Sequence, residues 1–220
     1  MRIPNNENIL YFVAHPDDEI IGVGGTIAKY SNEGKNNYVI IFSYGEVSHL
    51  KEEIIKLRRV RESTKAGKIV GVKDTIFFGL PDSNIKSKIE EMKIKDKVKQ
   101  LILKYNPEKI FTHSPSDPMP DHRTVNKVVI EALNEIKSKK GKKYDLYAFD
   151  IWNISNSKEK NEPRLYIDIS EFFWKKIEAL KEFKSQSHIM INFIPITFLR
   201  AKWYGLKAKC KYAERFYKLR

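Results

Sequence analysis

The sequence predicts a doubly wound α/β fold, in which helices cover both faces of a mostly parallel β-sheet, as in a three-layer Rossmann-like sandwich. Apolar runs alternate with helical patterns along the 220 residues. The first two runs are almost continuously apolar, which is typical of strands that are buried on both faces of a parallel sheet. The predicted strands are Ile9–Ala14, Tyr38–Ser43, Thr75–Gly79, Lys109–His113, Asp145–Trp152 and Leu165–Ile169.

Two segments between the predicted strands carry apolar residues at helical spacing. The first set is Ile94, Val98, Leu101, Ile102 and Tyr105, and the second is Val125, Val128, Val129, Ala132, Leu133 and Ile136. Parallel neighbouring strands need a crossover connection, which is usually a helix. The alternation of strand and helix therefore predicts a parallel sheet with helices on both sides.

The chain is long enough for one sizeable core, so we expect a single domain over residues 1–220. The polar stretch Ser155–Glu162 is interpreted as a surface loop. Residues 189–220 form a basic, aromatic-rich C-terminal segment whose apolar part, Ile189–Leu199, is interrupted by Pro195. We expect a C-terminal helix that packs on the domain, and contact with a membrane surface or a partner is the alternative.

The formal net charge of +13 is large enough to favour a polyanionic partner. The lysines are spread along the chain, however, and this favours a solvated basic surface over a dedicated nucleic-acid site. No apolar stretch approaches the roughly 20 residues that span a bilayer, and the polar residues 1–8 lack a signal-peptide core. We therefore expect a cytoplasmic protein, and a homo-oligomer is compatible with the sequence.

Cys210 is the only cysteine, so the chain cannot form an intrachain disulfide or a zinc site of several thiolates. Any metal must be held by histidines and carboxylates.

Two acidic and histidine-bearing clusters follow predicted strands. In open parallel sheets the ligand site lies beyond the carboxyl ends of the strands, so both clusters should reach the same edge. The first cluster, after Ile9–Ala14, is His15, Asp17, Asp18 and Glu19. The second cluster, after Lys109–His113, is Asp117, Asp121 and His122.

Catalytic zinc usually takes three protein ligands and leaves one position open for water. His15, Asp18 and His122 would supply two imidazoles and a carboxylate, and Asp17 could accept the proton of the bound water. Iron or another divalent ion is an alternative, because these ligands do not enforce zinc. The acidic residues could also simply begin a helix, where negative charge is favourable. His113 is either a supporting residue of the site or a satisfied core histidine.

Gly22, Gly24 and Gly25 do not predict a dinucleotide site. They come after the acidic loop, where carboxylates would repel a pyrophosphate. Small residues that let a helix approach the sheet explain them better.

These residues together resemble a known family. His15-Pro16-Asp17-Asp18-Glu19, followed by Gly22 and Gly24-Gly25-Thr26, and the later Pro120-Asp121-His122-Arg123, are similar to the motifs of the LmbE-like, PIG-L family of zinc-dependent N-deacetylases. Weaker similarities extend along the chain, in Arg59 with Glu62 and Gly71-Val72, and in Leu80-Pro81-Asp82.

The resemblance implies a doubly wound α/β fold and removal of acetyl groups from amino sugars or their conjugates. It implies zinc ligands at His15, Asp18 and His122 and a general base at Asp17. It also implies contacts of Arg59 and Asp82 with the sugar. We therefore expect a zinc-dependent amide hydrolase, with Asp121, His113 and Asp117 supporting the site or the substrate.

Two positions depart from the family pattern. Met119 stands where several members have a histidine that stabilises the transition state or protonates the leaving amine, and Asp117 stands where some have a tyrosine near the oxyanion. The group that protonates the leaving amine would then be His113, His188, a substrate group, or Asp17 if it returns the proton that it has taken. A metal-binding protein without hydrolytic activity and a basic module that binds nucleic acid or membrane remain as alternatives.

Overall fold

The computed structural model describes residues 7–45, 52–82, 85–136, 144–152 and 163–220. Its strands are β1 (Asn8–Val13), β2 (Asn36–Ser43), β3 (Val72–Leu80), β4 (Lys109–His113), β5 (Asp145–Phe149), β6 (Arg164–Asp168) and β7 (Ala213–Lys218). The helices are α1 (Asp18–Asn32), α2 (Glu52–Val70), α3 (Ile85–Lys88), α4 (Ile94–Tyr105), α5 (Pro120–Glu135), α6 (Phe173–Leu180) and α7 (Ser187–Ala208), with a 3₁₀ turn, η1, at Lys184–Gln186.

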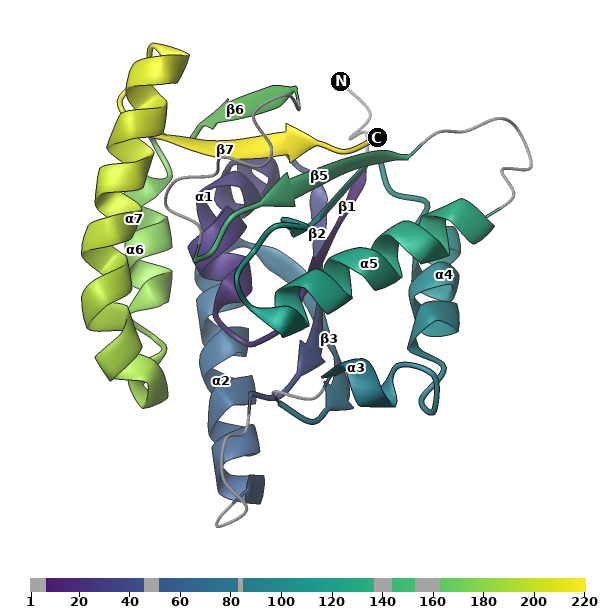
Figure 1. Ribbon diagram of the computed structural model, residues 1–220. Helices are drawn as coiled ribbons and strands as arrows, with labels where there is room; N and C mark the ends of the chain where they lie inside the picture. The colour runs from purple at the N-terminus through teal and green to yellow at the C-terminus, as the bar shows by residue number, and fades with distance from the viewer. Residues whose placement is uncertain (1–6, 46–51, 83–84, 137–143, 153–162) are drawn as a thin grey trace.

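The seven described strands form one sheet in the order β3-β2-β1-β4-β5-β7-β6 (Figure 1). The five strands from β3 to β5 are parallel, and β7 and β6 add an antiparallel edge. The chain leaves β1 toward β2 on one side, and β4 later joins β1 on the other. The predicted doubly wound α/β fold is confirmed, and its topological switch point lies between β1 and β4.

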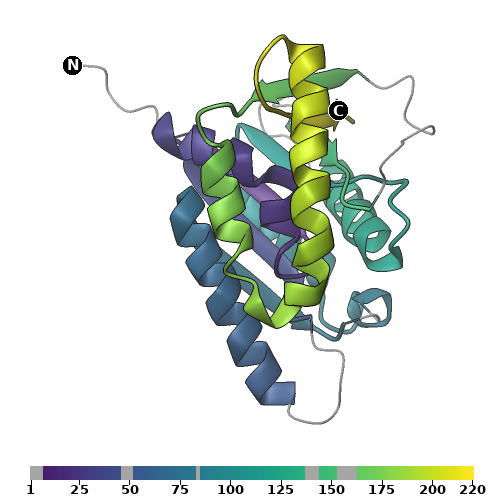
Figure 2. The same cartoon turned by 90° about the vertical axis from the view of Figure 1, so that its left-hand side faces the viewer.

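The alternation of side chains along β1 feeds two separate cores. Ile9, Tyr11 and Val13 point into a core shared with α1, α6 and α7. Leu10 and Phe12 point into a second core shared with α4 and α5. Figures 1 and 2 show the corresponding layers, with α1, α2, α6 and α7 on one face of the sheet and α4 and α5 on the other. Burial on both faces explains why the β1 sequence is apolar throughout.

The glycines of α1 allow the close helix packing that the sequence predicts. A Cβ atom on Gly22 would lie 2.4 Å from Phe149 Cδ2, and one on Gly25 would lie 2.5 Å from Ile169 Cδ1. Both distances are well inside van der Waals contact, so a larger residue would push α1 away from the sheet.

The second half of the chain differs from the sequence predictions at two points and contains the expected C-terminal helix. The strand expected over Asp145–Trp152 ends at Phe149, because the backbone amides of Ile151 and Trp152 turn toward a carboxylate of Asp117. The expected C-terminal helix is α7, which runs through Pro195 from Ser187 to Ala208 and packs on the domain. The expected basic tail contains β7, a strand that sequence inspection missed and that pairs with β5 and β6. The predicted loop Ser155–Glu162 lies outside the described residues.

None of the helices in the described part of the chain is long and apolar enough to span a bilayer.

A buried ion pair ties β7 to the helical layer. Lys176 Nζ lies 2.6 Å from Glu214 Oε1 and also donates to the carbonyl of Ile21 at 2.8 Å. The same carboxylate accepts the backbone amides of Gly25 and Thr26 at 3.0 and 2.8 Å. Each charge therefore has at least two hydrogen-bond partners, and the pair joins α6, β7 and the middle of α1.

Removing one partner of this pair should destabilise the fold. Lys176→Met leaves the buried Glu214 carboxylate without its counter-charge, and we expect the free energy of unfolding to fall by about 3 kcal/mol. Urea denaturation measures this loss. The matched control is Lys127→Met on α5, where the lysine side chain is 75% exposed and should matter by less than about 0.5 kcal/mol. Equal, small effects of both substitutions would contradict the stabilising role of the pair.

Candidate active site and metal centre

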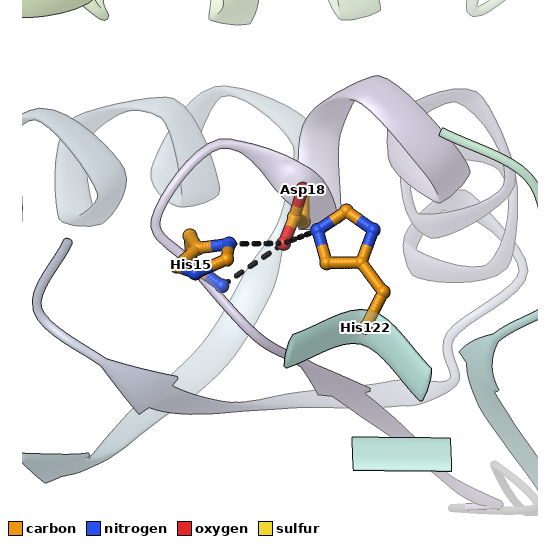
Figure 3. Close-up of side chains that lie close together, drawn as sticks. All are labelled: His15, Asp18 and His122. Atoms are coloured by element: carbon orange, nitrogen blue, oxygen red, sulfur yellow. Dashed lines mark hydrogen bonds and ion pairs between the residues drawn. The ribbon is translucent and has the colours of Figure 1, made fainter. Parts of the chain in front are cut away.

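Side chains from the two sequence clusters converge at the switch point. His15 and Asp18 lie on the loop after β1 and the first turn of α1, and His122 lies in the first turn of α5 (Figure 3). Asp18 Oδ2 lies 3.5 Å from His15 Nδ1 and 3.3 Å from His122 Nε2. The three ligand-type atoms are within 4.8 Å of one another. The fold thus brings together residues from the two clusters that the sequence analysis expected at one edge of the sheet.

The outer nitrogen of each imidazole faces a carboxylate. His15 Nε2 lies 2.9 Å from Asp82 Oδ1 and 3.4 Å from Asp121 Oδ2. His122 Nδ1 lies 3.0 Å from Asp117 Oδ1. A carboxylate on the second nitrogen fixes the tautomer and ring orientation of a metal-binding histidine and makes it a stronger ligand. Asp82, Asp121 and Asp117 therefore support the two imidazoles from behind.

The donor set fits a divalent cation. Two imidazole nitrogens and one carboxylate oxygen are ligands that zinc and iron both accept. A second trio, His15, Asp82 and Asp121, also lies within 4.8 Å, but it uses His15 through its other nitrogen. We favour the trio of His15, Asp18 and His122, because there both imidazoles keep a supporting carboxylate.

The protonation of the cluster shows which charge the site requires. Burial opposes a charged His122, but the carboxylates of Asp18 and Asp117 raise its pKa to about 9. The pKa of His15 is likewise raised well above its usual value, despite burial, by hydrogen bonds to Asp121, Asp18 and Asp82. Burial alone would raise the pKa of Asp18, yet His122 and His113 hold it well below its usual range. Without a metal, the raised pKa values favour positively charged imidazoles beside the Asp18 carboxylate. A bound metal ion would supply that positive charge instead.

Asp17 occupies a strained position beside this cluster. Its φ of 121° is rare for a residue with a side chain, and it immediately precedes α1. Its amide donates to Glu19 Oε2 at 2.9 Å, and Glu19 in turn accepts from Ser63 Oγ at 2.7 Å. Burial, and then the charge of Asp18, raise the pKa of Asp17 to about 7. A carboxyl group with this pKa can exchange a proton near neutral pH.

Arg59, on α2, holds the loop that carries Asp17. One guanidinium nitrogen donates to the carbonyl of Pro16 at 3.1 Å, and the other donates to the carbonyl of Gly45. The guanidinium also lies 3.7 Å from Asp17 Oδ2. Arg59 was expected to contact the sugar. Two of its hydrogen bonds go to loop carbonyls, and because Arg59 also lines the cavity, the contact with a sugar stays a prediction.

His113 supports the site as a neutral acceptor. Its Nε2 accepts the backbone amide of Ala14 at 2.9 Å, and its ring stacks on that of His122 with 3.9 Å between centroids. Burial, and then the charge of His122, lower the pKa of His113 to about 4. The ring therefore carries no acidic proton at neutral pH. This geometry favours the supporting role over that of the missing acid.

Asp117 and Met119 are the two positions that depart from the family pattern. Asp117 is fully buried and accepts the amides of Met119 at 3.0 Å and Ile151 at 3.3 Å, besides facing His122. The Met119 side chain lines the cavity and has no proton to donate. His188 is exposed in the first turn of α7 and does not line this cavity, and His49 lies outside the described residues.

A cavity of about 160 Å³ opens beside the cluster. Its polar floor contains His15, Asp17, Asp18 and His122, and Arg59 and Asp82 also line it. Its apolar wall comes from Ile151, Trp152, Ile189 and Phe193, with Trp152 packed edge-on against Phe193 at 4.7 Å between ring centroids. Sequence reasoning did not assign this wall, because the contact between the end of β5 and α7 has no local signature.

The fold and the site together define a doubly wound α/β protein with a histidine and carboxylate metal-type centre at its switch point. Residues 10–133 match the PIG-L family, described as GlcNAc-PI de-N-acetylase. The chain belongs to this family, as the sequence motifs indicated.

Known proteins of similar sequence and fold include deacetylases and one hydratase. A probable N-acetyl-alpha-D-glucosaminyl L-malate deacetylase 2 of Bacillus cereus is 26% identical over 195 residues, which cover 84% of this chain and 86% of the relative. The structure of N,N'-diacetylchitobiose deacetylase from Pyrococcus horikoshii has a TM-score of 0.81 at 21% identity and covers 98% of this chain and 84% of its own. That of 4-carboxy-2-hydroxymuconate hydratase from Pseudomonas putida has a TM-score of 0.80 at 21% identity, covering 97% and 96%.

Metal binding should release protons. At pH 7 both His15 and His122 are protonated in the metal-free protein, because the pKa of His122 is about 9 and that of His15 is well above its usual value. A divalent metal must displace about two protons, so its apparent affinity should rise as the pH rises toward 9. Titration calorimetry in buffers of different ionisation enthalpy counts the protons. His188→Ala should leave the count unchanged, whereas binding without proton release would show that the imidazoles are not ligands.

Proposed function

We propose that this protein is a metal-dependent hydrolase that removes an N-acetyl group from an amino sugar or glycoconjugate that contains N-acetylglucosamine. The observation that supports the proposal best is the convergence of His15, Asp18 and His122, with Asp17 beside them, at the switch point of a PIG-L family fold. Family membership and the names of its relatives supply the class of substrate.

His15, Asp18 and His122 would hold the metal. When bound, it would polarise the amide carbonyl and lower the pKa of a water molecule to about 7. Zinc is our proposed ion, because two imidazoles and a carboxylate with room for water match its catalytic sites. Iron(II) accepts the same ligands, and elemental analysis distinguishes them.

Asp17 is the proposed general base. It accepts a proton from the attacking water while the water oxygen bonds to the carbonyl carbon of the amide. Its pKa of about 7 suits this task, and the guanidinium of Arg59 at 3.7 Å steadies the loop that aims it. The positive φ of Asp17 lets the side chain reach the cavity while the next residue already begins α1.

Asp17 is also our proposed source of the proton for the leaving amine. Met119 cannot donate a proton. His113 is not protonated near neutral pH, because its pKa is lowered to about 4. When the carbon–nitrogen bond breaks, the proton taken from water returns to the amine nitrogen, and free amine and acetate leave. One residue would thus serve as base and then as acid.

The cavity supports an amino-sugar substrate. Its polar floor and single apolar wall match the two kinds of surface that a pyranose ring presents, hydroxyl edges and a C–H face. Trp152 is 45% exposed beside Phe193 and offers a flat surface for that face. Asp82, which lines the cavity next to His15, would accept a hydrogen bond from a sugar hydroxyl.

The discriminating experiment combines metal analysis with acetate release. The purified protein would be assayed with N-acetylglucosamine, diacetylchitobiose, N-acetylglucosaminyl malate and GlcNAc-phosphatidylinositol. We expect one bound metal ion per chain and release of acetate from at least one of these substrates, abolished by a chelator and restored by Zn²⁺ or Fe²⁺. Stoichiometric metal without acetate from any of them would favour the second candidate below.

The second candidate is a metal-binding homologue without deacetylase activity. Met119, in the place of a histidine of several family members, favours it. A complete metal site is compatible with either candidate, because the fold alone does not fix the reaction.

Asp17→Asn tests the catalytic assignment. The substitution removes the base but keeps the size of the side chain, so we expect kcat for acetate release to fall about 10³-fold while the metal content is unchanged. His122→Ala should instead lose the metal. Asp96→Asn, on the exposed surface of α4, is the matched control and should retain full activity. Wild-type turnover by Asp17→Asn would show that another group is the base.

A further inference from the structure

The outer face of α7 carries an apolar stripe that the fold leaves exposed. Ile191, Leu199, Trp203 and Leu206 are 71%, 66%, 57% and 73% exposed. At 3.6 residues per turn, their spacing places all four within a sector of about 120° around the helix axis. The opposite side of α7 is already occupied, because Met190, Phe193 and Ala201 pack in the core. The helix is therefore apolar on two sides and has a protein partner on only one.

The segment that carries this stripe has charge of a single sign. Residues 183–213 contain six lysines and arginines and not one aspartate or glutamate. Of the described helices with eight or more residues, α7 alone lacks an acidic residue. Lys207 Nζ lies 5.1 Å from the centre of the Trp203 ring, and the exposed Lys202 directly precedes Trp203 while the exposed Lys207 directly follows Leu206 in the helix. Cations thus border the apolar stripe.

We propose that the outer face of α7, formed by Ile191, Leu199, Trp203 and Leu206, docks on an anionic lipid surface. An amphipathic helix with tryptophan and leucine on one side and lysines along its border lies in the plane of a membrane interface. The aliphatic parts of the lysines rest on the apolar surface while their ammonium groups reach the phosphates. The contact is peripheral.

Charge argues against a second copy of this chain as the occupant. In a two-fold dimer the same patch meets itself, so each cationic border would face another cationic border. The net charge of +13 adds a repulsion that an anionic membrane turns into attraction. Nucleic acid would use the cations but leave the leucines in water.

The stripe also lies on a helix that lines the candidate active site. Ile189 and Phe193, in the first two turns of α7, line the cavity, and Ile191 between them faces outward. Figures 1 and 2 show α7 as an outer element of the helical layer. A membrane-docked α7 would therefore hold the wall of the site close to the lipid surface.

Vesicle binding tests the proposal without reference to activity. The full chain would be floated with vesicles of phosphatidylcholine alone or with about 30% phosphatidylglycerol, at about 50 and 500 mM salt. We expect binding to the anionic vesicles at low salt and a large loss at high salt. Equal binding to both compositions, or binding to neither, would overturn the proposal.

Matched variants separate the stripe from general basicity. Leu206→Gln should weaken binding to the anionic vesicles about tenfold. Leu103→Gln is the matched control, because this leucine on α4 is also exposed, at 58%, and its substitution should have no effect on binding. Lys207→Gln should weaken binding more than Lys127→Gln on α5. Both glutamine substitutions of leucine lie on exposed faces, and urea denaturation verifies that each variant is folded.

Two other results would assign the surface elsewhere and refute the lipid proposal. A change in sedimentation mass between wild type and Leu206→Gln, without vesicle binding, would make the stripe a contact between copies of this chain. Retention on RNA that Leu206→Gln leaves intact, again without vesicle binding, would make the basic border a nucleic-acid site. Loss of acetate release would bear only on the proposed function.

Discussion

The arrangement of the site depends on one constraint, which is that the Asp18 carboxylate is buried at the switch point and must be matched by positive charge. A buried carboxylate without a counter-charge is costly, so cationic partners have to reach it. His15 and His122 approach it from two different elements as the cationic partners, and the neutral ring of His113 lies beside it at the end of β4, with 3.4 Å between Nε2 and the Asp18 carboxylate. Only the topology that places β4 beside β1 brings these rings to the same point. Because the pKa values of His15 and His122 are both raised, a divalent cation that bound here would have to displace protons from the imidazoles.

A second layer of residues maintains this arrangement. Each candidate imidazole ligand has a carboxylate at its second nitrogen, and the loop before α1 is held by hydrogen bonds to Arg59 and Glu19. This support is what allows Asp17 to keep a backbone conformation that costs about 1–3 kcal/mol. Strain of this kind persists only where the surroundings fix it, and here it aims a carboxyl group of perturbed pKa into the cavity. The loop, its supporting residues and the metal-type centre therefore form one structural unit.

The helix α7 links this unit to the outside of the molecule. Its inner side supplies Ile189 and Phe193 to the wall of the cavity, and its outer side carries exposed apolar residues bordered by lysines. The buried pair of Lys176 and Glu214 fixes β7, and β7 in turn supports α7. One helix near the C-terminus thus contributes both to the wall of the cavity and to the exposed apolar surface, whereas the cluster of histidines and carboxylates comes from residues 15–122.

The sequence by itself determined the fold class and the central cluster. Apolar runs such as Ile9–Ala14 and the motifs around His15 and His122 are local signals, and the rule that ligands sit at the carboxyl ends of parallel strands joined them. Tertiary structure alone decided the rest. Strand β7 is paired only through contacts with β5 and β6, so its short, basic sequence did not reveal it. The roles of Asp117 and Arg59, and the wall of Trp152 and Phe193, likewise arise from residues distant in sequence, whose contacts no local pattern encodes. Local periodicity specifies which face of an element is buried, but only the packed fold specifies what it is buried against.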